Sequence, residues 1–217
     1  MKKWTALFLS VIMMCGLVAC GSSSNTDSAK KEDAASTQQE SGAESKNNDA
    51  KSESSNTGTS KTAVVYFSGT GNTKAVAEQI AEELSADIYE IEPKEPYTDD
   101  DLDYNNDSCR ANQEMKDDSA RPEIANDLSD VLQYDTIYIG HPIWWGTAPR
   151  IIQTFLDSYD LSGKTIYTFC TSGGSGIEQS VSDLRKAYPN LNIKGGYRFQ
   201  RNASASDIQE GLKKLAQ

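Results

Sequence analysis

Residues 68–73, Ser-Gly-Thr-Gly-Asn-Thr, form a stretch rich in glycine and hydroxyl groups. An apolar run at residues 63–67 precedes it, and a segment with helical spacing of apolar residues, 74–84, follows it. A strand, a tight turn and a helix in this order present backbone N–H groups to a phosphate. Gly69 and Gly71 allow backbone angles that are closed to other residues, so the chain can wrap closely around an anion. Further hydrogen-bond donors come from the side chains of Ser68, Thr70, Asn72 and Thr73.

This stretch therefore predicts a phosphate-binding turn, and the simplest alternative is an ordinary strand–helix turn capped by Thr or Asn. The ATP-binding pattern does not fit, because no Gly-Lys-[Ser/Thr] follows Gly69 at the required spacing. The dinucleotide-binding pattern does not fit either, because Lys74 stands where its third glycine is required.

The composition divides the chain of 217 residues into unequal parts. Residues 21–60 contain no Val, Ile, Leu, Met or aromatic residue. Such a segment cannot bury enough apolar surface to offset the entropy lost on ordering, so we expect a disordered linker. Residues 61–217 remain as one globular domain of ordinary size.

The first 20 residues have the pattern of an export signal. Lys2 and Lys3 are followed by an apolar run at residues 7–18 that ends in small residues. The sequence Leu-Val-Ala-Cys at 17–20 resembles the lipobox of bacterial lipoproteins, which implies lipidation of Cys20. We therefore expect an extracytoplasmic lipoprotein held on the cell membrane, and the alternatives are a plain signal peptide or a short membrane anchor.

Apolar runs alternate with amphipathic segments from residue 62 onward. Strands are predicted at residues 62–67, 87–91, 135–140, 164–171 and 192–199. Helices are predicted at residues 73–85, 123–133, 149–159, 176–188 and 206–215. This alternation predicts an α/β fold: a doubly wound, five-stranded parallel sheet of order 2-1-3-4-5 with helices on both faces.

Two more turns follow predicted strands and should lie near the first. Residues 141–146 read His-Pro-Ile-Trp-Trp-Gly, and residues 171–176 read Thr-Ser-Gly-Gly-Ser-Gly. In a parallel sheet of this kind, ligands bind beyond the carboxyl ends of the strands. The two indoles offer flat surfaces for stacking on a ring, and the glycine-rich turn offers backbone donors to the edge of a heterocycle.

The three motifs together resemble the flavodoxin family. Residues 67–81 (FSGTGNTKAVAEQIA) are similar to its phosphate loop, roughly [T/S]-x-T-G-x-T. Residues 140–149 (GHPIWWGTAP) and 170–176 (CTSGGSG) resemble the branch that has a Pro-x-Trp-Trp loop. The resemblance spans residues 62–217 and implies noncovalent FMN and transfer of one or two electrons.

The resemblance also implies which residues bind the cofactor, and it implies no catalytic side chain. The phosphate loop would comprise Ser68, Gly69, Thr70, Gly71, Asn72 and Thr73. The first ring loop would comprise Pro142, Ile143, Trp144, Trp145 and Gly146. The second would comprise Thr171, Ser172, Gly173, Gly174 and Gly176. Adjacent residues rarely point the same way, so we expect one tryptophan, Trp145, to stack on the ring and the other to pack.

Several other side chains have two possible roles. His141, the only histidine, is either structural or a proton donor near the flavin. Cys170 is a small buried residue or forms a disulfide with Cys109. Arg110 pairs with nearby carboxylates or reaches the flavin. The sequence has no Cys/His cluster, so we expect no transition-metal site.

A long acidic stretch, residues 93–122, separates the second strand from the next predicted helix. It contains nine of the acidic residues of the domain, whose net charge is −10. Its Tyr, Leu and Met residues favour an ordered cover over the site. The acidic groups either form a solvated face, or they make the flavin a stronger reductant and steer a basic redox partner. The charge disfavours binding to nucleic acid and to anionic lipid.

These observations predict an FMN-binding electron-transfer protein tethered to the outer face of the cytoplasmic membrane. One alternative is an NAD(P)H-dependent quinone, nitro or azo reductase of the same fold. Another is a binding module that has kept the fold and lost the flavin.

Overall fold

Five parallel strands form the centre of the structure. The computed structural model describes residues 60–217, and its strands are β1 (Thr62–Tyr66), β2 (Asp87–Glu90), β3 (Thr136–Pro142), β4 (Thr165–Thr171) and β5 (Asn192–Phe199). They pair in the order β2-β1-β3-β4-β5, and every pair is parallel. The predicted sheet and strand order are confirmed.

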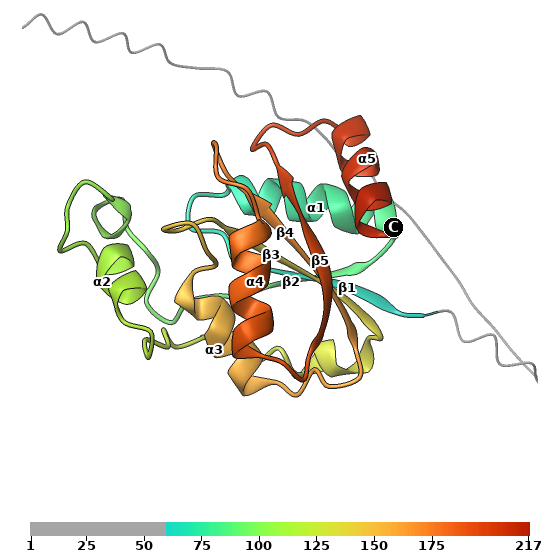
Figure 1. The fold of residues 1–217 in the computed structure, drawn as a ribbon, viewed down its shortest axis with the longest axis horizontal. Helices are drawn as coiled ribbons and strands as arrows, with labels where there is room; N and C mark the ends of the chain where they lie inside the picture. The colour runs from blue at the N-terminus through green and yellow to red at the C-terminus, as the bar shows by residue number, and fades with distance from the viewer. Residues whose placement is uncertain (1–59) are drawn as a thin grey trace, which may run out of the picture. The chain divides into compact units, whose positions relative to one another are not determined.

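Helices cover both faces of this sheet (Figure 1). The first face carries α1 (Asn72–Leu84) and α5 (Ala205–Leu215). The second carries α3 (Arg150–Ser158) and α4 (Glu178–Ala187). The doubly wound arrangement is therefore also as predicted.

Alternating side chains of the strands supply the two cores. In β1, Val64 and Tyr66 pack in one apolar cluster, together with Ile80 of α1. Ala63 and Val65 point the other way and belong to the second cluster. Both faces of a central parallel strand are buried, which explains why β1 reads as a continuous apolar run.

The prediction of a helix at residues 123–133 is wrong. Only its last part is helical, as the short 3-10 helix η2 (Ser129–Gln133). Residues before it run alongside the chain that leaves β2: Lys94 N donates to Glu123 O, and Ala125 N donates to Glu92 O. These bonds to a distant segment outweigh the helical spacing of the apolar residues, which is a weak local preference.

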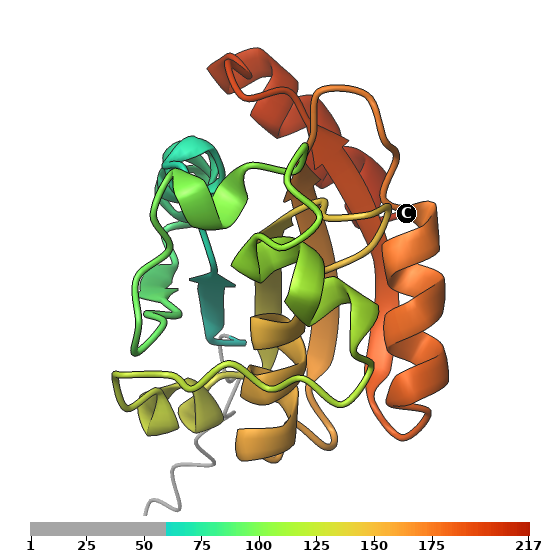
Figure 2. The same ribbon diagram turned by 90° about the vertical axis from the view of Figure 1, so that its left-hand side faces the viewer.

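The helix of this region instead lies in the acidic stretch, which is ordered as predicted. We call residues 93–122 the cover segment; it contains the 3-10 helix η1 (Asp100–Leu102) and the helix α2 (Arg110–Lys116). Figure 2 shows the cover segment in front of the ends of the strands. Ala111 and Met115 of α2 are buried in the second core cluster, so the segment packs on the domain.

The predicted signal at residues 1–20, including Cys20, and the linker at 21–60 lie outside the described residues, except for residue 60. Within residues 60–217, no helix has the length and apolar character needed to cross a membrane.

Gly140 of β3 tests the side-chain packing against its neighbour in β4, Phe169. A Cβ at this position would lie 2.1 Å from Cζ of Phe169, which is fully buried. Overfilling a packed core costs about 1–3 kcal/mol, so Gly140→Ala should lower the free energy of unfolding by about that amount in urea titrations. Gly195→Ala is the control, because a Cβ there has no atom within 4 Å. Equal losses in the two variants would contradict this packing.

Candidate functional site

The predicted phosphate-binding turn leads directly into α1. Gly71 caps the helix in the left-handed region, at φ +80°, and a Cβ there would meet nothing within 4 Å. No side chain caps the helix, whose first internal hydrogen bond runs from Ala75 N to Gly71 O. The N–H groups of the first helical turn are therefore available to an anion, which the helix dipole also favours.

Ser68, the first residue of this turn, carries an unusual hydroxyl. Its Oγ is buried and has no hydrogen-bond partner within the described residues. It is the one such side-chain atom found in that part of the chain. A buried polar group without a partner costs about 1–3 kcal/mol, so such a group points to a missing partner, such as a ligand oxygen.

The other polar side chains of the turn already have partners. Asn72 Nδ2 donates to Thr70 Oγ1 over 2.8 Å. Thr73 Oγ1 and Thr171 Oγ1 share a buried hydrogen bond of 2.8 Å. This second bond ties the start of α1 to the end of β4, so two of the three predicted turns are joined directly.

A cavity of about 450 Å³ brings parts of all three turns together. Its lining includes residues predicted for the site: Thr70, Asn72, Pro142, Thr171, Ser172 and Gly173. The other predicted residues do not line this cavity: Ser68, Gly69, Gly71, Thr73, Ile143, Trp144, Trp145, Gly146, Gly174 and Gly176. The convergence at the carboxyl ends of the strands is as expected.

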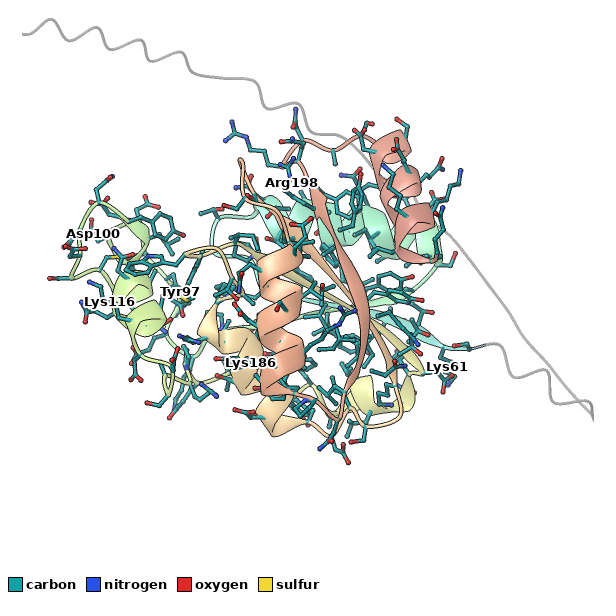
Figure 3. The ribbon with its side chains drawn as sticks, in the orientation of Figure 1. Lys61, Tyr97, Asp100, Lys116, Lys186 and Arg198 are labelled. Atoms are coloured by element: carbon teal, nitrogen blue, oxygen red, sulfur yellow. The ribbon has the colours of Figure 1, made fainter. Side chains whose placement is uncertain are left out.

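Three residues that line this cavity were missed in the sequence. Gln200, Arg201 and Asn202 form the loop after β5. Because β5 is parallel to the other strands, its carboxyl end reaches the same edge, and this rule was signal enough to find the loop. Arg198, near the end of β5 in Figure 3, also donates from Nη1 to Ser172 O over 3.3 Å and so supports the third turn.

The two tryptophans lie in a tight turn that separates their side chains. Trp144 N donates to Thr147 O, and Thr147 N donates to Trp144 O, over 2.9 and 3.0 Å. Between them, Trp145 and Gly146 have φ values of +50° and +85°. Positive φ at both central positions defines a type I′ turn. A tryptophan rarely occupies a central position of such a turn.

Trp144 is a core residue. It is 2% exposed and makes edge contacts with the rings of Phe67, Tyr97 and Tyr104, at centroid distances of 5.7, 5.2 and 6.4 Å. Two of these rings belong to the cover segment, so Trp144 anchors that segment to the sheet.

Trp145 is the exposed member of the pair. The residue is 56% exposed, at the tip of the turn, and its Nε1 donates to Asn112 Oδ1 of α2 over 2.8 Å. The separation of the two indoles agrees with the sequence-based expectation. Stacking of Trp145 on a flavin remains a prediction.

His141 is structural. It is fully buried, its Nδ1 lies 2.9 Å from Pro142 O, and its Nε2 lies 3.2 Å from Ser180 Oγ. A carbonyl only accepts, so Nδ1 carries the proton and Nε2 accepts from the serine. Burial lowers the pKa of His141 to about 4, against the opposing effect of the bond to Pro142. With both nitrogens engaged, the ring is poorly placed to serve as a proton donor.

The structure also decides between the alternatives for Cys170 and Arg110. Cys109 and Cys170 are both free and buried, so the suggested disulfide is wrong, and burial raises the pKa of Cys170 to about 12. Arg110 Nε binds Glu114 over 2.7 Å, and the guanidinium lies 4.0 Å from the Tyr97 ring centroid, so it pairs within the cover segment. Residues 60–217 contain no group of His, Cys, Asp and Glu suited to a metal ion.

The pKa of His141 predicts a pH dependence of stability. Folding lowers this pKa from 6.5 to about 4, so between these values the unfolded chain binds more protons. The stabilising contribution is complete above pH 6.5 and is lost as the pH falls toward 4. The slope is at most about 1.4 kcal/mol per pH unit. Urea titrations across this window should show a shallower slope for His141→Asn, and parallel curves would contradict the buried neutral imidazole.

One family model and several solved structures are similar to this chain. A family model described as Flavodoxin matches residues 61–215. A protein from Bacteroides eggerthii, assigned as a flavoprotein, has a crystal structure that is 43% identical over 73% of this chain and 99% of its own, with a TM-score of 0.69. A protein from Bacteroides uniformis, also assigned as a flavoprotein, has a crystal structure that is 42% identical over 71% of this chain and 98% of its own. Its TM-score is also 0.69.

A flavoprotein from Lactobacillus acidophilus, solved in complex with FMN, is 29% identical over 73% of this chain and 99% of its own, with a TM-score of 0.59. No curated protein sequence gives a significant match. With its strand order, its three converging turns and the match over residues 61–215, the chain belongs to the flavodoxin family.

Proposed function

We propose that this domain binds FMN noncovalently at the carboxyl edge of the sheet and carries electrons between partner proteins. Membership of the flavodoxin family supports the cofactor, as does the FMN complex of the Lactobacillus acidophilus relative. The single observation in this chain that carries the proposal is the buried Ser68 hydroxyl, which lacks a partner beside the uncapped start of α1.

The residues around the phosphate turn fit a phosphate group. Ser68 Oγ and the N–H groups of the first turn of α1 supply neutral donors. Lys74, the nearest cation in sequence, is paired with Glu90 over 2.9 Å. Arg201 lines the cavity and has no ion pair with another described residue, so it can supply positive charge toward the phosphate. Neutral hydrogen-bond donors and one cation would therefore surround a phosphate that carries about two negative charges.

The two ring loops fit the flavin end. The third turn is held by Arg198 and has open space around Gly173 and Gly174, so its backbone can approach a ring edge closely. Trp145 presents an exposed indole on the opposite loop. When bound, FMN supplies the electron-accepting and electron-donating group, and the protein orients it and sets its surroundings.

The cover segment supplies the electrostatic surroundings. Asp99, Asp100, Asp103 and Asp107 are exposed, and Asp100 points away from the sheet in Figure 3. Negative charge near a flavin disfavours adding electrons, and an acidic rim attracts a basic partner in a salt-dependent way. We therefore propose a basic redox partner protein that approaches this side of the domain.

We also propose where the protein resides. Lipidation of Cys20 would anchor the chain on the outer face of the cytoplasmic membrane, and residues 21–60 would serve as a flexible tether. The support for this part is the sequence pattern of residues 1–60.

An absorbance titration with FMN, followed by stepwise reduction, tests the function. The purified full chain should bind FMN, oxidise NAD(P)H slowly, and exchange electrons rapidly with a reduced protein donor. Fast turnover of NAD(P)H with a quinone, nitro or azo acceptor would favour the reductase alternative instead. Protein that stays colourless and takes up no FMN would contradict both and leave the binding module.

Ser68→Ala tests the phosphate end. Loss of one hydrogen bond to a charged group should raise the Kd for FMN about tenfold or more, while the Kd for riboflavin, which lacks the phosphate, stays unchanged. Stability without ligand should be equal or higher, because the hydroxyl has no partner to lose. Thr73→Val serves as the contrasting variant. It breaks the hydrogen bond to Thr171, so it should lower the stability of the ligand-free protein, which Ser68→Ala should not. Equal losses for both ligands in Ser68→Ala would refute the assignment.

Cys20→Ser tests the anchor. Without the thiol there is no site for the lipid, so the variant should move from the membrane fraction to the soluble fraction of fractionated cells. Cys15→Ser, a cysteine inside the apolar run, is the control and should leave the protein on the membrane. Retention of the Cys20 variant on the membrane would refute lipidation at this residue.

A further inference from the structure

Asn112 of α2 is fully buried and makes hydrogen bonds through both ends of its amide. Its Nδ2 donates to Tyr104 O over 3.1 Å and to Asn106 O over 2.9 Å. Its Oδ1 accepts from Trp145 Nε1 over 2.8 Å. The two carbonyls only accept and an indole N–H only donates, so the amide has a single orientation that satisfies all three partners.

This contact joins two connections that are separate in the chain. Asn112 belongs to the cover segment between β2 and β3, whereas Trp145 belongs to the loop after β3. The cover segment is held to the core through Trp144, so α2 offers Asn112 from a fixed base. The Trp145 indole therefore has its polar edge attached to a packed element, although more than half of the residue is exposed.

One face of the indole also has a neighbour. Lys116 Nζ, at the end of α2, lies 5.7 Å from the centre of the Trp145 ring, and it donates to Asp107 O over 3.0 Å. Figure 3 shows Lys116 within the cover segment. A cation near one face and a hydrogen bond at the edge restrict the rotation of the ring.

We infer that Asn112 is a positioning residue for the flavin ring, acting through Trp145. It holds the indole in one orientation before the cofactor arrives, so binding does not have to immobilise an exposed, freely rotating side chain. The inference rests on the proposed function, because it assigns Trp145 to the ring end of FMN. It also makes the cover segment part of the binding site, since the segment supplies Asn112.

The test uses full-length protein and four variants. Asn112→Leu removes the amide at similar volume, and Trp145→Phe keeps an aromatic ring without the N–H. The double variant asks whether the two residues act as one unit. Asn126→Leu is the matched control: this asparagine also ties loop backbone, through Glu90 O and Glu92 N, and does not hydrogen-bond Trp145.

Each single variant at 112 or 145 should raise the Kd by about fivefold, the cost of ordering one side chain on binding. The factor should be the same for FMN and riboflavin, because the effect lies at the ring and not at the phosphate. The Kd of the double variant for either flavin should be no higher than the higher of the two single-variant Kd values. The midpoint potential of the bound flavin should shift in both single variants and stay unchanged in Asn126→Leu, which should lose only stability.

An unchanged Kd in Asn112→Leu, or losses that multiply in the double variant, would overturn the inference. Should Asn112→Leu fail to fold, Trp145→Phe decides, because it leaves the bonds from Asn112 to Tyr104 and Asn106 in place. Unchanged affinity for both flavins in that variant would then overturn it. Failure of the unaltered protein to bind FMN would overturn the proposed function itself, which is a different result from altered binding in the variants.

Discussion

All five strands run in one direction, so each connection that leaves a strand begins at the same edge of the sheet. The pairing of β1 with β3 places the phosphate turn beside the tryptophan turn, and the pairing of β3 with β4 adds the glycine-rich turn. These chain segments are distant in sequence and meet only because the strands pair in this order. The cavity at this edge, lined by parts of all three turns, depends on that constraint.

The site combines polar groups that are satisfied with one that is not. Thr73 and Thr171 bond each other, and His141 bonds Pro142 and Ser180, so these side chains hold the turns in place and have little capacity left for a ligand. Ser68 differs, because its hydroxyl is buried without a partner. Fixed surroundings with an unfilled hydrogen bond are what a preorganised binding site requires.

Much of this arrangement could be predicted from the sequence, because strand and helix periodicity and the turn residues are local signals. The non-helical course of residues 123–125 could not, because these residues bond to the distant backbone of residues 92–94. The sequence indicated that Trp145 would stack on the ring and that the other tryptophan would pack. The type I′ turn at Trp145 and Gly146 is the physical reason that the two indoles point apart. Asn112 carried no signal at all, because its role comes from contacts with residues 104, 106 and 145.

If the FMN phosphate satisfies the unpartnered Ser68 hydroxyl, as proposed above, the supply of cofactor is linked to the lifetime of the protein. A ligand that satisfies it binds the folded chain and not the unfolded one, so folding stability rises with the logarithm of the free ligand concentration once that exceeds the Kd. Proteases act on the transiently opened chain, whose population falls by the same factor. A copy of this protein that finds no FMN would therefore be degraded sooner, so the amount of protein that persists would follow the FMN available where it resides.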